Sequence, residues 1–134
     1  MLRAANARRI VEIGALAGEH TELLLDTMGE DAELHVIDPV PQFDPDEHRE
    51  RFGGRYVFHR DISHNVLPRL EPMDAALIDG DHNWYTVYHE LRQLAEVSER
   101  AAVALPVMLL HDTYWPYGRR DLYYTPDRIP QEFR

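Results

Sequence analysis

The chain has 134 residues, of which 44% are hydrophobic, and this length predicts one compact domain over residues 1–134. The absence of cysteine excludes disulfides, iron–sulfur clusters and thiolate zinc sites, and a net charge of −10 argues against nucleic-acid binding, which usually needs a basic face. No stretch approaches the roughly 18 apolar residues of a membrane span, and the first residues lack the apolar core of a secretory signal, so we expect a cytoplasmic protein that acts on small molecules.

Apolar runs alternate with amphipathic segments, a pattern typical of a parallel sheet flanked by helices. We predict strands over 8–14, 33–39, 55–62, 73–79 and 107–112. Helices are predicted over 19–29, with Gly29 as the C-cap, within the charged stretch 40–54, and over 83–98, where one face carries Trp84, Val87, Leu91, Leu94 and Ala95. This order predicts an α/β, doubly wound, Rossmann-like and mostly parallel sheet with strand order 3-2-1-4-5. Ligands of such sheets bind beyond the carboxyl ends of the strands.

Glycines mark the turn after the first predicted strand. In VEIGALAGEHT, Gly14 and Gly18 permit positive φ and close approach to a ligand beside a helix N-terminus. Leu16 stands where the dinucleotide fingerprint has its middle glycine, so a pyrophosphate would find less room than a nucleoside with a compact amino-acid tail. A plain tight turn is the alternative interpretation.

Asp38 closes the second predicted strand, 20 positions after Gly18. An acid at this place commonly accepts hydrogen bonds from ribose hydroxyls, although it can also cap a helix. The glycine turn upstream favours the ribose interpretation.

Four segments, VEIGALAGEHT, LHVIDP, HRDIS and LIDGDHNW, together resemble class I S-adenosylmethionine-dependent methyltransferases, especially small O-methyltransferases of the catechol and macrolide-sugar types. The resemblance implies S-adenosylmethionine as cofactor and a small hydroxylated acceptor, such as the sugar or phenol of a natural product. It also implies cofactor contacts, with the methionine part near Glu12, Gly14, Leu16, Gly18 and His20, the ribose on Asp38, and the adenine near Asp61 and Ile62.

The same resemblance implies a divalent metal ion in some members, held by acids at the ends of the fourth and fifth strands. The matching positions are Asp79, His111 and Asp112. Mg²⁺ prefers oxygen ligands, whereas the imidazole of His111 would suit a softer metal such as Mn²⁺, Fe²⁺ or Zn²⁺. The alternative is that Asp112 caps a turn and His111 bonds to backbone.

His82 lies three residues after Asp79, where catechol-type relatives carry a lysine base and some sugar methyltransferases a histidine. This chain has no lysine, and an imidazole titrates near neutral pH, so His82 is the predicted general base, with Asp79 beside it in the catalytic set. Asp81 either orients His82 or caps the following helix. A purely structural histidine is the alternative.

The segment 113–134 is rich in tyrosine, tryptophan and arginine. Its aromatic residues could line an acceptor site near the active centre, and Arg119 and Arg120 could pair with a carboxylate or phosphate. They could equally pack on the sheet edge or against a second subunit in a homodimer.

The chain is short beside the seven-stranded family that it resembles, which adds helices before the first strand and a hairpin after the fifth. It would then be a minimal enzyme completed by dimerisation, a piece of a larger enzyme, or a non-catalytic cofactor-binding or partner domain. A nicotinamide-dependent oxidoreductase is disfavoured because the middle glycine is missing.

Overall fold

A computed structural model of the protein describes residues 6–113 and residue 131. Its centre is a five-stranded parallel sheet in the order β3-β2-β1-β4-β5, which confirms the predicted fold class and strand order. The strands are β1 (Arg9–Ile13), β2 (Glu33–Ile37), β3 (Tyr56–His59), β4 (Ala75–Ile78) and β5 (Val107–Leu110).

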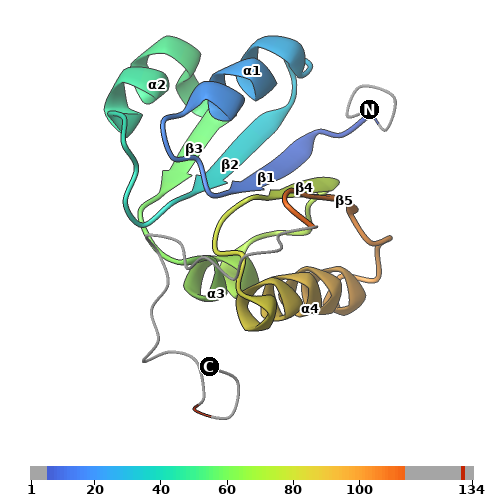
Figure 1. Cartoon of the computed structure of the whole chain (residues 1–134). Coiled ribbons are helices and arrows are strands. Elements are labelled where there is room, and N and C mark those ends of the chain that lie inside the picture. Colours follow the sequence, from blue (N-terminus) through green and yellow to red (C-terminus); the bar gives the residue numbers. More distant parts are fainter. Residues whose placement is uncertain (1–5, 114–130, 132–134) are drawn as a thin grey trace.

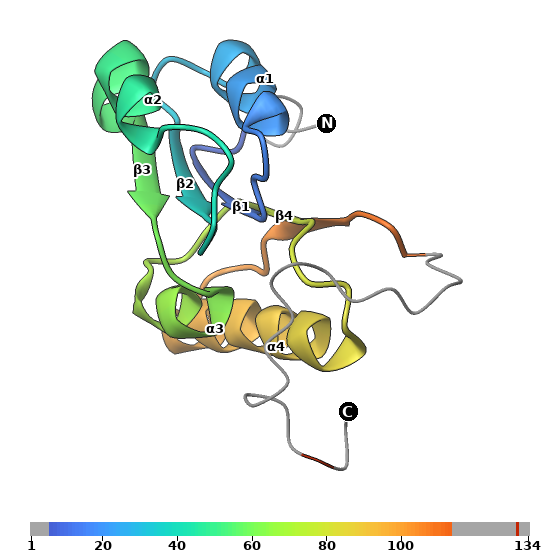
Figure 2. The ribbon, with the colours of Figure 1, turned by 60° about the vertical axis from the view of Figure 1, so that its left-hand side comes forward.

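Helices cover both faces of the sheet (Figure 1). On one face lie α1 (Glu19–Thr27) and α2 (Pro45–Phe52), and on the other lie α3 (Ser63–Val66) and α4 (Trp84–Arg100), as the rotated view in Figure 2 also shows. Short 3₁₀ turns, η1 (Gly53–Arg55) and η2 (Leu67–Arg69), lie before β3 and after α3. None of the helices in the described part of the chain is long and apolar enough to cross a membrane.

Each face of the sheet has its own apolar core, because alternate strand residues point to opposite sides. Toward α1 and α2, Ile10 and Leu34 pack with Leu25. Toward α3 and α4, Val11 and Ile37 pack in a second cluster. Burial on both faces explains why the strands appear in the sequence as nearly continuous apolar runs.

Backbone hydrogen bonds extend one residue beyond the strands and align their carboxyl ends. The N–H of Gly14 donates to the carbonyl of Ile37 at 2.9 Å, and that of Asp79 donates to the carbonyl of Ile13 at 2.9 Å. In the same way, the N–H of Asp38 donates to the carbonyl of His59 in β3 at 3.2 Å. The N–H of His111 donates to the carbonyl of Ile78 in β4 at 3.0 Å. The sheet register therefore places Gly14, Asp38, Asp79 and His111 in one row at the same edge.

Helix α1 ends before the predicted C-cap. It stops at Thr27, and Met28 leaves the helix in an extended conformation, with its N–H bonded to the carbonyl of Leu24 at 2.8 Å. The prediction that Gly29 caps this helix is therefore wrong. Met28 packs into the core, so burial of its side chain directs the chain away from the helix before a glycine is needed.

The buried face of α4 also differs from the predicted one. Its buried residues are Glu90, Leu94, Val97 and Ser98, whereas Trp84 is 55% exposed. Trp84 lies in the first turn of the helix, and its ring contacts those of Tyr85 and Tyr88 on the same helix. Placing Trp84 on the buried face was therefore wrong.

Candidate functional site

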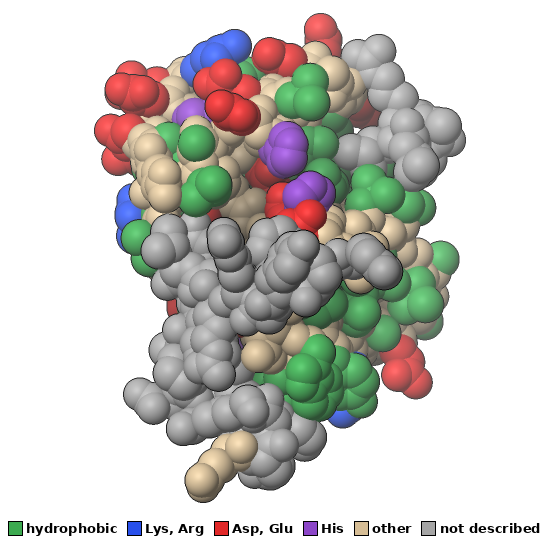
Figure 3. Space-filling model, viewed as in Figure 1, with side chains coloured by type: hydrophobic (Ala, Val, Ile, Leu, Met, Phe, Trp, Pro, Cys, Tyr) green, Lys and Arg blue, Asp and Glu red, His purple; other side chains and the backbone are tan. Residues whose placement is uncertain are grey.

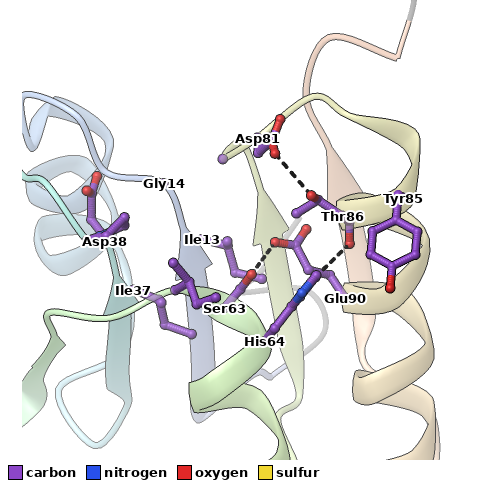
Figure 4. Close-up of a pocket in the computed structure, with 13 residues that line it drawn as sticks. Ile13, Gly14, Ile37, Asp38, Ser63, His64, Asp81, Tyr85, Thr86 and Glu90 are labelled. Atoms are coloured by element: carbon purple, nitrogen blue, oxygen red, sulfur yellow. Dashed lines mark hydrogen bonds between the residues drawn. The ribbon is translucent and has the colours of Figure 1, made fainter. Parts of the chain in front are cut away.

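A hollow opens at the carboxyl edge of the sheet, between the tips of β1 and β2 and the helices α3 and α4 (Figure 4). Its empty volume is about 590 Å³, with open solvent at the mouth included. Gly14 and Asp38 lie at one end, and Ser63 and Glu90 lie at the other. The sheet thus forms a crevice at the predicted place.

Asp38 is fully buried and holds the turn that follows β1. One carboxylate oxygen accepts hydrogen bonds from the N–H groups of Ala15 and Leu16, both at 2.9 Å, and the other accepts from the N–H of Val40 at 2.8 Å. The Asp38 side chain also lines the hollow, which is where a residue that binds ribose would lie. The contact with ribose itself stays a prediction. The observed role of Asp38 is to fix the turn against the tip of β2.

The turn between β1 and α1 takes left-handed backbone at three alternate positions. The φ angles are +85° at Gly14, +46° at Leu16 and +82° at Gly18. A Cβ atom on Gly14 would lie 2.3 Å from the carbonyl oxygen of Asp79, so the tip of β4 requires a glycine there whatever the ligand. Leu16 takes the conformation of the missing middle glycine, and the bond from its N–H to Asp38 stabilises it.

Glu12 is buried beside this turn and does not line the hollow. Its Oε2 accepts a hydrogen bond from the hydroxyl of Thr21 at 2.5 Å. Burial raises the pKa of Glu12 to about 7, the Thr21 bond lowers it, and the charges of Asp79 and Asp38 raise it again. The predicted contact of Glu12 with the methionine part stays a prediction.

His20 lies on the surface, with Nδ1 4.0 Å from Asp79 Oδ2.

Of the two residues predicted near the adenine, only Ile62 lines the hollow. Asp61 folds back on the start of α3, where its Oδ1 accepts from the N–H of Ile62 and the amide of Asn65, both at 2.8 Å. Its other oxygen lies 3.6 Å from Arg69 Nη2. In this conformation Asp61 organises the α3 turn.

A second hollow lies between the tips of β4 and β5 and the start of α4. The residues that line this second hollow include His82, Trp84, His111 and Asp112. The two hollows share Gly80 and Asp81. Figure 3 shows histidine side chains beside acidic ones on the face viewed. The two hollows therefore adjoin at the tip of β4.

His82 pairs with Asp112 at the second hollow. The distance from His82 Nε2 to Asp112 Oδ2 is 3.4 Å, and the His82 side chain is only 15% exposed. Asp81 serves the helix instead, because its oxygens accept from the N–H of Asn83 at 2.9 Å and the hydroxyl of Thr86 at 3.0 Å. The N-cap of α4 is Asn83, whose side chain accepts from the N–H of Tyr85 at 2.9 Å, so Asp81 braces the first turn of the helix without capping it.

The predicted metal ligands lie together at this edge. Nδ1 of His111 is 3.0 Å from Asp79 Oδ1 and 3.3 Å from Asp112 Oδ1. Within residues 6–113 and 131, however, no three or more histidine, aspartate or glutamate side chains form a group that could hold a metal ion. The metal prediction is not confirmed.

The predicted aromatic wall, with Arg119 and Arg120, lies outside the described residues.

A family model described as a methyltransferase domain matches residues 11–113. The chain belongs to the class I S-adenosylmethionine-dependent methyltransferases.

One solved structure that resembles this methyltransferase is a crystal structure entitled "putative O-methyltransferase from Klebsiella pneumoniae". The TM-score is 0.52 at 24% identity, and the match covers 69% of this chain and 46% of that chain. The likeness shows a shared fold, and this methyltransferase corresponds to about half the length of that protein. No curated protein matches the chain at a significant level.

The structure adds residues to which the sequence analysis gave no role. Ser63, Thr86 and Glu90 line the first hollow, and Ser63 donates a hydrogen bond to Glu90. The signal for Glu90 was its helical spacing, since it precedes Leu94 by four positions and Val97 by seven. An acid on the apolar face of a helix is a reason to expect a buried carboxyl group.

Proposed function

We propose that this methyltransferase transfers the methyl group of S-adenosylmethionine to a hydroxyl oxygen of a small acceptor, a sugar or a phenol, with His82 as general base. The observation that carries the proposal is the pair of adjoining hollows at the strand tips. The first has the glycine turn and Asp38, which suit a nucleoside, and the second has His82.

The reaction needs alignment of three atoms and removal of one proton. The acceptor oxygen forms a bond to the methyl carbon as the carbon–sulfur bond breaks, and S-adenosylhomocysteine leaves. His82 takes the hydroxyl proton, and the negative charge of Asp112 at 3.4 Å stabilises the imidazolium that forms. The low exposure of His82 limits competition from bulk water.

The charge at the strand tips favours a cationic cofactor. Burial is the main cause of the raised pKa of Glu12, and the negative charges of Asp79 and Asp38 raise it further, so carboxylates lie close together around the β1 tip. The sulfonium and ammonium groups of S-adenosylmethionine would lower the energy of these carboxylates. A dinucleotide, with its negative pyrophosphate, would be repelled.

Replacement of His82 tests the catalytic role. In His82→Ala we expect turnover of a catechol and glycoside panel with radiolabelled S-adenosylmethionine to fall by roughly 10²–10⁴-fold, because proton transfer by a positioned base contributes about that much. Asp112→Asn should lose less, because the base remains.

The dissociation constant for S-adenosylhomocysteine, measured on the same variants, should stay within a factor of about two of the parent protein, as the base does not hold the cofactor. Unchanged turnover in His82→Ala would contradict the assignment. If the parent protein binds the cofactor but methylates no acceptor, the chain is a cofactor-binding or partner domain instead.

Metal assistance is the alternative mechanism for this site, but among the described residues no group of three or more histidine, aspartate or glutamate side chains could hold a metal ion. We therefore expect activity to survive dialysis against a chelator. Loss of activity on dialysis, with recovery on addition of Mg²⁺ or Mn²⁺, would establish a metal ion instead.

A further inference from the structure

The deep end of the first hollow carries a buried carboxyl group that the proposed methyl transfer does not use. Glu90 of α4 is 1% exposed, and its Oε1 accepts a hydrogen bond from the Ser63 hydroxyl of α3 at 2.5 Å (Figure 4). Its Oε2 is buried and has no hydrogen-bond partner among the described residues. Because an unpaired buried oxygen is costly and rare in native proteins, this group points to a ligand.

The surroundings of Glu90 keep it neutral. Burial is the main reason that its pKa rises to about 8, the Ser63 bond opposes the rise, and the negative charge of Asp81 adds to it. The other titratable side chains of the hollow are His64 of α3, Tyr85 of α4 and Asp38 at the far end. At neutral pH the carboxyl group therefore keeps its proton. Since Oε1 accepts from Ser63, the proton resides on Oε2, which is then a donor.

We propose that Glu90 determines specificity for the base of the cofactor, because its carboxylic acid donates a hydrogen bond to a ring nitrogen of adenine at the deep end of the hollow. This inference rests on the proposed function, which places the ribose near Asp38. The apolar side chains of Ile13, Ile37 and Ile62 line the hollow and suit a flat ring.

The position of Asp61 supports the assignment to Glu90. Asp61 is the acid that the sequence motifs placed near the adenine, yet it does not line the hollow. Its Oδ1 accepts hydrogen bonds from the N–H of Ile62 and from the side-chain amide of Asn65. The Asp61 oxygen and the Ile62 N–H group, which could otherwise contact a base, are therefore bonded to each other. Glu90 does line the hollow, together with Ser63.

Removal of single ring nitrogens from the ligand tests the contact without changing the protein. The dissociation constants of S-adenosylhomocysteine and its 1-deaza, 3-deaza and 7-deaza analogues are measured by calorimetry at pH 7 on the parent protein. We expect one analogue to bind about tenfold more weakly than the others, since one hydrogen bond of about 1.4 kcal/mol corresponds to that factor.

The same analogue should lose nothing further in Glu90→Leu, because the donor is then absent from the protein and the acceptor is absent from the ligand. Glu90→Gln keeps a donor and the acceptor for Ser63, so it should restore the preference. Glu99→Gln, an exposed acid on the same helix, is the matched control and should behave as the parent protein.

A pH series gives a second readout that a merely structural Glu90 would not move. From the pKa of about 8, affinity for S-adenosylhomocysteine should be roughly tenfold weaker at pH 9 than at pH 7 in the parent protein, beyond any change seen in Glu90→Gln. Comparison with the variant removes the titration of the ligand's own amino group.

The outcomes separate the inference from the proposed function. If S-adenosylhomocysteine binds but no single nitrogen matters, or the loss persists unchanged in Glu90→Leu, the Glu90 contact is overturned and the proposed function stands. If S-adenosylhomocysteine does not bind at all, the proposed function fails and this inference fails with it.

Discussion

Single side chains at the strand tips combine structural and chemical roles. Asp38 accepts hydrogen bonds from three backbone N–H groups, which the sequence could not reveal, because those partners come from two turns that meet only in the fold. Its position at the end of β2 was predictable from the apolar run and from Pro39. The pairing of His82 with Asp112 could not be predicted from the sequence, since Asp112 lies on a different strand tip.

The two buried acids should make stability fall as pH rises. The pKa of Glu12 is raised to about 7 and that of Glu90 to about 8, from 4.5. Between pH 4.5 and 8 the folded state therefore holds more protons than the unfolded state, so the free energy of unfolding decreases through this window. We expect a loss on the order of a few kcal/mol, measured by urea denaturation at pH 5 and pH 8.5.

Glu12→Gln and Glu90→Gln should each reduce the slope of the free energy of unfolding against pH. A neutral amide then replaces the titrating acid and still accepts the hydrogen bond from Thr21 or Ser63. The exposed Glu99→Gln should leave the slope unchanged. An equal slope in the parent protein and the double variant would show that other groups cause it.

At the scale of elements, the strands and long helices followed from apolar periodicity, whereas the connections did not. Helix α3 has four residues, SHNV, and is too short to show a helical period. The left-handed conformation of Leu16 was not predictable, because leucine disfavours it and bonds to Asp38 and from Gln42 stabilise it. The turn that predicted the ligand site is therefore held by contacts distant in sequence.

The requirement for glycine in this turn can be measured. Gly14→Ala should lower the free energy of unfolding by roughly 2–5 kcal/mol, because the added Cβ combines positive φ with overlap against the β4 backbone. Gly53→Ala meets open space but a backbone with φ of +60° and ψ of −140°, and should lose roughly 1–3 kcal/mol, whereas Gly54→Ala should be nearly neutral. A neutral Gly14→Ala would show that the tip of β4 can move away.

At the scale of the whole molecule, the parallel sheet brings separate strand ends to one edge. Aligned register places residues from distant parts of the sequence, such as Gly14 and His111, at a single edge. The order of strands was predictable from the alternation of elements, and this order located the crevice. The division of that crevice into two hollows depends on side-chain packing around Gly80 and Asp81, which no motif indicates.

Calorimetric titration of the protein with S-adenosylmethionine, S-adenosylhomocysteine and NAD tests the account most directly. We predict that both adenosyl ligands bind with one-to-one stoichiometry and that NAD does not bind measurably, because the turn at Leu16 and the acids around it exclude a pyrophosphate. Binding of NAD in preference to S-adenosylmethionine would contradict the account.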